Sequence, residues 1–277
     1  MPPLDSRDPA SPKLKGLLTR AATAAVLVPL AAGIVIVGGR AYSALIAFMS
    51  IILIFEWARI VDRAEFSRGF YTLSITAIGA VYFAAGGHYW TAFVLALGGG
   101  AVATLLEMRR KPAVSWPLVG AIYLVVPTIA TLFIRHDPEA GRGYTLLLFF
   151  VVWATDSGAY LVGTFAGGPK LWEKLSPKKT WSGAMGGLFF GAVTALVVGA
   201  LVGLPLSPRS LLLTGFALAF AALAGDLFES ALKRLYGVKD TGGAFPGHGG
   251  VLDRLDGFIF AAMALAMLLL VRGPGMA

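Results

Sequence analysis

Long apolar stretches separated by short polar segments dominate the chain from about residue 21 onward. Each stretch has about 16 to 22 residues, close to the ~20 that an α-helix needs to cross a bilayer. The bilayer core offers backbone groups no water, so these stretches should be helices and not open sheet. The pattern predicts an all-α, polytopic transmembrane helical protein of about nine spans, at roughly 21–38, 41–58, 70–86, 89–106, 116–134, 144–164, 182–204, 209–228 and 257–271.

Composition favours the same class. The 277 residues are 57% hydrophobic and 14% charged, whereas soluble domains are about half apolar and about a quarter charged. The chain has no cysteine, which excludes disulfides and thiolate sites and leaves a metal to oxygen or imidazole ligands. The net charge of +8 comes from basic residues in short loops beside apolar stretches. There they orient the chain and meet anionic lipid, so we expect no nucleic-acid partner.

The basic residues are distributed unevenly between alternate loops. With the N-terminus in the cytoplasm, 18 of the 23 Lys and Arg residues fall on that side and five on the other, as the positive-inside rule requires. We therefore expect loops 165–181 and 229–256 to face the cytoplasm. Motif-like polar residues also gather in the second half, which divides the chain into an N-terminal transmembrane scaffold, 1–140, and a catalytic transmembrane region, 141–277.

A polar stripe ends the eighth apolar stretch. Asp226, Glu229, Ser230 and Lys233 stand at i, i+3, i+4 and i+7, which is one face of a helix. Glu229 and Lys233 could form an ordinary i,i+4 ion pair, and for Glu229 that reading is as good as a functional one. Asp226 follows the apolar run FALAFAALAG, too deep for easy solvation, so its carboxylate should need a cation.

A glycine-rich loop leads from this stripe to Asp253 and Asp256 at the start of the last apolar stretch. Either aspartate could simply cap a helix, and that reading fits Asp256 better than Asp253. Glycines let backbone N–H groups approach an anion, and Mg²⁺ is usually held by one or two carboxylates and phosphate oxygens. The loop therefore favours a site for a Mg²⁺-bound polyphosphate. His248 could instead bond the loop backbone. The glycines are Gly242, Gly243, Gly247, Gly249 and Gly250, and the nearby basic residues are Lys233, Arg234, Lys239, His248 and Arg254.

The segment SPKKTW precedes the seventh apolar stretch. Lys178 and Lys179, between the hydroxyls of Ser176 and Thr180, suit a phosphate or lipid headgroup. The segment could equally be a positive-inside anchor with an interfacial Trp. The spacing does not decide between these readings.

Asp156 lies inside the sixth apolar stretch, in WATDSGAY. An ionised carboxylate at that depth needs a partner. It is expected to line the same cavity, unless it makes a buried bond to Ser157 or Tyr160.

Together these residues resemble the signature of the phosphatidate cytidylyltransferases, the CDP-diacylglycerol synthases. The resemblance extends over essentially the whole chain. Two positions are atypical: Ser182, where an acidic residue is common, and Thr241, where Ser is common. The matching positions are Asp156, Gly158, Ala159, Tyr160, the SPKKTW segment, Gly225, Asp226, Leu227, Ser230, Lys233, Arg234, Lys239, Asp240, Gly242, Pro246, His248, Gly249, Gly250, Asp253, Arg254 and Asp256.

The resemblance implies that CTP and phosphatidic acid give CDP-diacylglycerol and pyrophosphate. It also implies Mg²⁺, with a second cation as an option, and a homodimer in the bacterial inner membrane among membrane lipids. The family's paired aspartates correspond to Asp226 and Asp253, which we expect to bind metal together with Asp256. Expected catalytic residues are Asp226, Asp253, Lys233, Lys239, Asp240, His248 and Arg254, and expected substrate-binding residues are Asp156, Ser176, Lys178, Lys179, Thr180, Ser230, Arg234, Gly247, Gly249 and Gly250.

Two other functions compete with this one. A CTP-dependent lipid kinase would use similar residues to phosphorylate a polyprenol or related alcohol, releasing CDP instead of pyrophosphate. A membrane transporter with an acidic site would move a substrate without nucleotide turnover. The chain shows no convincing internal repeat, a feature of many transporters, and its polar residues cluster at one face.

Overall fold

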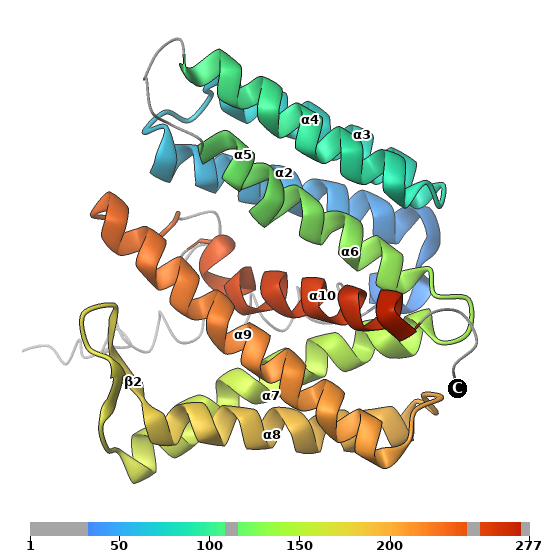
Figure 1. The fold of residues 1–277 in the computed structure, drawn as a ribbon, viewed down its shortest axis with the longest axis vertical. Coiled ribbons are helices and arrows are strands. Elements are labelled where there is room, and N and C mark those ends of the chain that lie inside the picture. The colour runs from blue at the N-terminus through green and yellow to red at the C-terminus, as the bar shows by residue number, and fades with distance from the viewer. Residues whose placement is uncertain (1–32, 109–115, 243–249, 273–277) are drawn as a thin grey trace, which may run out of the picture.

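The structure is a computed structural model that describes residues 33–108, 116–242 and 250–272 (Figure 1). These residues are almost entirely helical, which confirms the predicted all-α class. The elements in chain order are α2 (Gly39–Val61), α3 (Arg68–Ala85), α4 (Tyr89–Met108), α5 (Trp116–Gly120), the π-helical turn η1 (Ala121–Val125), α6 (Val126–Arg135), α7 (Gly141–Ala166), β1 (Lys170–Trp172), β2 (Ser176–Thr180), α8 (Trp181–Leu201), α9 (Pro208–Tyr236) and α10 (Leu252–Arg272).

Seven helices of the described part are long and apolar enough to cross a membrane, as in an integral membrane protein. They are α2, α4, the continuous run α5–η1–α6, α7, α8, α9 and α10, and they match seven of the predicted stretches. The stretch predicted at 70–86 is helix α3, but Arg68, two tyrosines and three hydroxyl side chains make it less apolar, and it is not among the seven. The first predicted span, 21–38, lies mostly outside the described residues. The predicted number of nine is therefore not confirmed.

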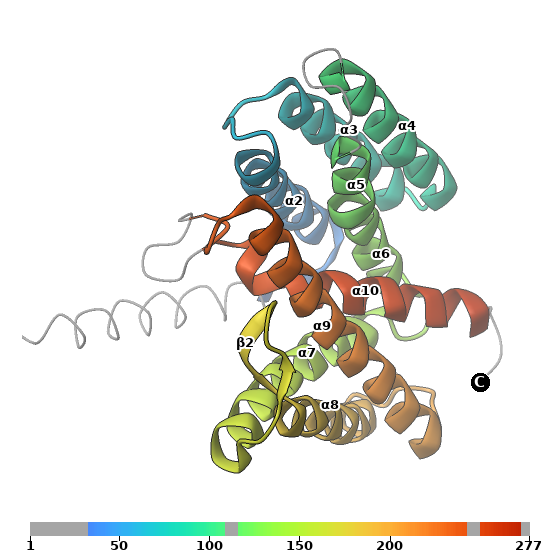
Figure 2. The same ribbon diagram turned by 60° about the vertical axis from the view of Figure 1, so that its left-hand side comes forward.

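Helix α10 lies between two groups of helices (Figures 1 and 2). On one side are α2 to α6, and on the other are α7, α8 and α9. Leu252 and Ile259 of α10 join the buried core of the first group, while Ala262 and Leu265 join that of the second. The two halves of the chain thus share one central helix.

Small residues allow α7 and α8 to pack closely. A Cβ added at Gly183 would lie 2.8 Å from the carbonyl oxygen of Ala159, and one at Gly187 would lie 3.0 Å from that of Thr155. Glycine at such positions lets helix backbones approach each other, a common device in membrane bundles. Close packing here holds the hairpin of β1 and β2, which connects the two helices, beside the end of α7.

The two predicted polar loops are shorter and more ordered than expected. Within 165–181, β1 and β2 pair in an antiparallel hairpin. Within 229–256, α9 continues to Tyr236 and α10 begins at Leu252, so most of the described residues there are helical. The apolar span was predicted to end at residue 228, and the i, i+3, i+4, i+7 spacing placed residues as far as Lys233 on the same helix. Those residues stay helical because Glu229 and Lys233 pair along the helix face, and Gly237, with a left-handed φ of 67°, ends it.

Helices of alternating direction bring the polar elements to one end of the molecule. The C-terminal ends of α7 and α9, the N-terminal ends of α8 and α10, and the hairpin all lie on the left in Figure 1. The turn between α6 and α7 lies at the opposite end. Figure 2 shows the hairpin beside α7 and α8 from a second direction.

This arrangement predicts the sidedness of two exposed glutamates. Glu173→Cys in the hairpin and Glu139→Cys in the α6–α7 turn are single cysteines in a cysteine-free chain. In sealed vesicles, an impermeant maleimide should label them from opposite sides. Labelling of both from the same side would contradict the helix directions described here.

Candidate active site

A cavity of about 580 Å³ lies at the polar end, among α7, α8, α9, α10 and the hairpin. It collects side chains that are far apart in the sequence and places four carboxylates opposite three lysines. The first half of the chain contributes none of its lining residues. The charged lining residues are Asp156, Lys170, Lys178, Lys179, Asp226, Asp253 and Asp256.

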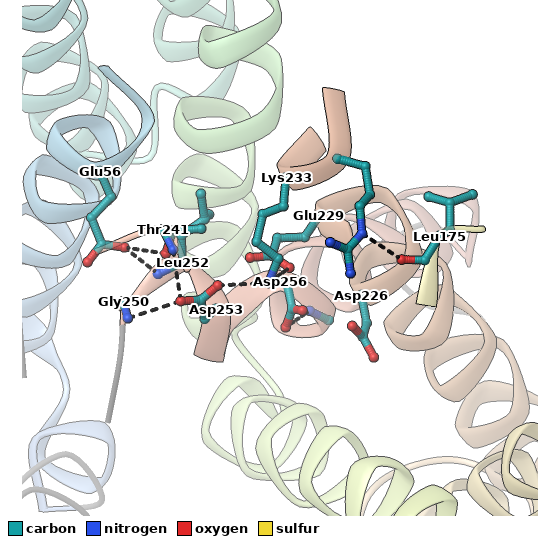
Figure 3. A network of polar contacts seen from close by, with 12 residues as sticks. Glu56, Leu175, Asp226, Glu229, Lys233, Thr241, Gly250, Leu252, Asp253 and Asp256 are labelled. Carbon is teal, nitrogen blue, oxygen red and sulfur yellow. Dashed lines mark hydrogen bonds and ion pairs between the residues drawn. The ribbon is translucent and has the colours of Figure 1, made fainter. Parts of the chain in front are cut away.

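Three carboxylates on α9 and α10, Asp226, Glu229 and Asp256, form an acidic cluster (Figure 3). One oxygen of each lies within 4.8 Å of the others. Asp226 and Glu229 are one turn apart on α9, and Asp256 is in the first turns of α10 beside them. Glu229 is only 1% exposed, and its Oε1 accepts no hydrogen bond from the described residues.

The acidic cluster has the donor set that Mg²⁺ requires. Carboxylate oxygens are the hard ligands that this ion prefers, and a buried carboxylate oxygen with no donor, such as Glu229 Oε1, needs a cation or a proton. The residues present therefore fit a divalent cation. Two of the three predicted ligands, Asp226 and Asp256, belong to this cluster, and Glu229 is the third member.

Two lysines bring positive charge to the acidic cluster. Lys179 Nζ, from the end of the hairpin, lies 2.5 Å from Asp226 Oδ2. Lys233 Nζ lies 2.6 Å from Glu229 Oε2, so the i,i+4 pair suggested by the sequence is present, and 2.9 Å from Asp253 Oδ1. Removing either partner of such a pair would leave the charge of the other uncompensated. The hairpin is thus tied to α9 by charge.

Asp253 occupies a different position from the acidic cluster, although it also lines the cavity. Its Oδ1 pairs with Lys233, and its Oδ2 accepts hydrogen bonds from the backbone N–H groups of Thr241 and Gly250, both at 3.1 Å. These two residues lie at the two ends of the glycine-rich segment 242–250. Asp253 therefore organises Lys233 and both ends of that segment, and its expected role as a metal ligand stays a prediction.

Other predicted residues have structural contacts or lie apart from the cavity. Arg234 Nε donates to the carbonyl oxygen of Leu175 at 3.3 Å, which links α9 to the hairpin. Thr180 lines the cavity and caps α8, because its Oγ1 accepts from the N–H of Gly183 at 3.1 Å. The predicted Ser176, Ser230, Lys239, Asp240, Gly250 and Arg254 are not among the lining residues, and the predicted Gly247, His248 and Gly249 fall outside the described residues.

The structure adds Glu56, which the sequence analysis missed. Glu56 of α2 is 1% exposed and accepts hydrogen bonds from Thr241 Oγ1 and from the N–H groups of Val251 and Leu252. Its signal was available, because a carboxylate inside the apolar run IILIFEWARI is costly at membrane depth. The same cost led to the prediction of Asp226 and Asp156 as functional residues, whereas the first half of the chain was interpreted as scaffold.

Tyr123 is a second residue that was not predicted, and unlike Glu56 it has no sequence signal. It lies on the π-helical turn η1, and its ring packs against those of Phe228 and Phe260, at centroid distances of 4.9 and 6.1 Å. Its hydroxyl is buried and has no hydrogen-bond partner among the described residues. Such π-helical turns are frequent at functional sites. Only the folded structure brings this residue next to α9 and α10.

Comparison with known proteins identifies the family. Residues 18–271 match the model of the cytidylyltransferase family. The chain belongs to that family. It is 35% identical over 254 residues to a phosphatidate cytidylyltransferase of Brucella suis biovar 1 (strain 1330), covering 91% of this chain and 93% of the relative. It is 42% identical over 151 residues to the phosphatidate cytidylyltransferase of Bacillus subtilis (strain 168), covering 54% and 56% of the two chains.

The family match includes both halves of this cytidylyltransferase. It begins before α2, which carries Glu56, and ends within α10. The first half and the cavity therefore both fall within the family match, and the resemblance seen in the sequence is confirmed.

The carboxylates of the cavity should differ in their effect on metal binding. Asp226→Asn and Asp256→Asn should each weaken Mn²⁺ binding, measured by electron paramagnetic resonance, and lower cytidylyl transfer by at least ~10²-fold, the scale of one lost preorganised charge. Asp253→Asn should lower turnover as well. A change in the Mn²⁺ affinity of this variant would identify Asp253 as a metal ligand, whereas an unchanged affinity would identify Asp253 as the residue that positions Lys233.

A suitable control is Asp137→Asn, at the opposite end of the molecule, where the carboxylate accepts hydrogen bonds from the backbone N–H groups of Glu139 and Ala140. Metal affinity equal to wild type in both Asp226→Asn and Asp256→Asn would remove the acidic cluster from the metal site.

Proposed function

We propose that this member of the cytidylyltransferase family transfers the cytidylyl group of CTP to phosphatidic acid, giving CDP-diacylglycerol and pyrophosphate. The observation that carries the proposal is the cavity in which a membrane-edge acidic cluster meets the lysines of the hairpin. The names of the relatives support the choice of phosphatidate as acceptor.

The reaction places particular demands on the cavity. An oxygen of the phosphatidate phosphate forms a bond to the α-phosphorus of CTP, and the bond from that phosphorus to the oxygen bridging to the β-phosphate breaks. Pyrophosphate leaves with the electron pair. A phosphate monoester has a second pKa of about 6, so its attacking oxygen is already anionic near neutral pH. The chain therefore needs to position the reactants and neutralise charge more than to supply a strong base.

The charges that the reaction needs can be assigned to named side chains. We propose Asp226, Asp253 and Asp256, which all line the cavity, as the residues that hold Mg²⁺, with Glu229 beside them. Bound Mg²⁺ supplies Lewis-acid stabilisation of the phosphate oxygens. Lys233, which pairs with Glu229 and Asp253, is proposed to neutralise phosphate charge from the α9 side. Lys239, Arg254 and His248, from the glycine-rich segment and its flanks, are proposed to contact the triphosphate.

The lipid substrate is proposed to enter along α7 and α8. Lys178 and Lys179 line the cavity next to Tyr160, which is 72% exposed. Phe165 and Trp181 are also largely exposed at this end of the two helices. Aromatic side chains of this kind are typical of the membrane interface. The headgroup phosphate would therefore reach the lysines while the acyl chains stay in the bilayer.

Location and assembly are part of the proposal. The uneven distribution of basic residues supports a cytoplasmic position for the cavity, where CTP is available. The bacterial relatives support an inner-membrane location. The homodimer and a second cation are retained as proposals from the family resemblance.

Product analysis with labelled CTP tests the reaction itself. Purified protein should incorporate label from the α-phosphate into a lipid that requires phosphatidate, and should release label from the γ-phosphate as pyrophosphate. Transfer of the γ-phosphate label to lipid, with CDP as the other product, would establish the lipid kinase instead. Substrate flux without nucleotide turnover would establish the transporter.

The two hairpin lysines should affect different steps. Lys178→Gln should raise KM for phosphatidate about 10-fold in mixed micelles and change KM for CTP little, on the scale of one charge-assisted hydrogen bond. Lys179→Gln should also lower kcat, because Asp226 loses the partner at 2.5 Å. Lys174→Gln, at the exposed turn of the hairpin and outside the cavity lining, is the matched control. A loss of CTP affinity alone in Lys178→Gln would indicate that the hairpin binds CTP and not phosphatidate.

A further inference from the structure

Glu56 receives three hydrogen bonds from the flanks of the glycine-rich segment, although it belongs to the scaffold half of the chain. Its Oε1 accepts from the N–H of Val251 at 2.9 Å, and its Oε2 accepts from the N–H of Leu252 at 2.8 Å and from Thr241 Oγ1 at 3.1 Å (Figure 3). These donors are 185 to 196 positions away in the sequence. The contact therefore connects the two halves of the molecule.

The carboxylate is suited to this position because three donors converge on its two oxygens. Val251 and Leu252 start α10, and N–H groups at a helix start have no partner within the helix. A negative group there also interacts favourably with the helix dipole. Among the described residues, no Lys or Arg lies within ion-pair distance of Glu56. A glutamine would turn an NH₂ group toward at least one of these donors.

The same two chain flanks are held from the other side by Asp253. The hydroxyl of Thr241 donates a hydrogen bond to Glu56, and the N–H of Thr241 donates one to Asp253. The N–H of Gly250 also donates to Asp253, next to the N–H groups that bond to Glu56. A Cβ at Gly242 would lie 2.7 Å from Glu56 Oε1, and one at Gly250 would lie 2.8 Å from Oε2. The flanks of the segment thus fit closely between two carboxylates.

A series of contacts connects Glu56 of the first half to the acidic cluster. Asp253 pairs with Lys233, and Lys233 pairs with Glu229 of the acidic cluster. A displacement of Thr241 or Gly250 would therefore change the position of Asp253 and Lys233 relative to the cavity. Errors of about 1 Å at such a distance from the chemistry can cost about 10²-fold in rate.

We propose that Glu56 is a positioning residue for cytidylyl transfer: it fixes the two flanks of the glycine-rich segment, and through them Asp253 and Lys233. The kinetic part rests on the proposed function, whereas the anchoring of α10 does not. Glu56 lines no part of the cavity, so its effect on the reaction is indirect.

Two measurements on Glu56→Gln test the proposal in the full-length protein. Amide hydrogen exchange over residues 250–256 should become at least ~10-fold faster, the scale of about 1.4 kcal/mol from hydrogen bonds to a charged group. The kcat/KM for CTP should fall about 10²-fold, while KM for phosphatidate should stay within about twofold, because no described contact joins Glu56 to the hairpin.

Thr241 supplies a second pair of variants in case Glu56→Gln does not fold. Thr241→Val removes one donor to Glu56 with little change in volume and should reduce kcat/KM for CTP by about 10-fold, whereas Thr241→Ser keeps the hydroxyl and should restore it. Glu107→Gln is the matched control, because Glu107 is also a buried scaffold carboxylate, 6% exposed, and accepts from the N–H of Gly69 on α3. It should leave exchange over 250–256 unchanged.

Several outcomes would decide the matter. Wild-type exchange and kinetics in Glu56→Gln, or equal losses in Thr241→Val and Thr241→Ser, would overturn the proposal. Equal effects of Glu107→Gln and Glu56→Gln on exchange over 250–256 would reduce Glu56 to general stability and overturn it as well. If wild-type protein turns over no CTP but Glu56→Gln still exchanges faster over 250–256, the proposed function fails and the anchoring role stands.

Discussion

The free-energy cost of keeping ionised carboxylates away from water is the physical constraint on which the site depends. Each ionised group at the edge of an apolar bundle costs several kcal/mol unless it is paired, hydrogen-bonded or bound to a cation. The structure meets this cost with different partners: Lys179 for Asp226, Lys233 for Glu229 and Asp253, and backbone N–H groups for Glu56. The positions of the hairpin, α9 and α10 follow from these pairs.

Helix α10 connects these carboxylates to the packing of both groups of helices. Its apolar residues belong to both buried cores, so neither group of helices can shift without moving it. Its N-terminal end carries Asp253 and Asp256 and is bound by Glu56 from the scaffold. The half of the chain that contributes no lining residue to the active-site cavity therefore still determines where two of that cavity's carboxylates lie. These contacts join the two halves of the chain, so the halves are not separate folding units.

Much of this could be predicted from sequence, for identifiable reasons. The positions of seven spans follow from apolar length, and the family follows from closely spaced polar motifs, so these agree with the structure and the comparisons. The loop expected at 229–256 begins later, because α9 continues to Tyr236; the one-face spacing of Asp226, Glu229 and Lys233 had already indicated a helix there, and Glu229 and Lys233 pair along it. Glu56 was missed because the first half of the chain was treated as scaffold, although a carboxylate in an apolar run was a signal. Tyr123 was missed because the rings of α9 and α10 that it packs against are more than a hundred positions away. The grouping of Glu229 with Asp226 and Asp256 depends on the crossing of two helices, which periodicity does not specify.

The most direct test of the account is the position of the cation. Crystals grown with Mn²⁺ and a non-hydrolysable CTP analogue would show it by anomalous scattering. The account predicts a peak bound by carboxylate oxygens of Asp226 and Asp256 inside the cavity, with the glycine-rich flanks still bonded to Glu56. A peak remote from both aspartates, with the analogue bound elsewhere, would contradict it.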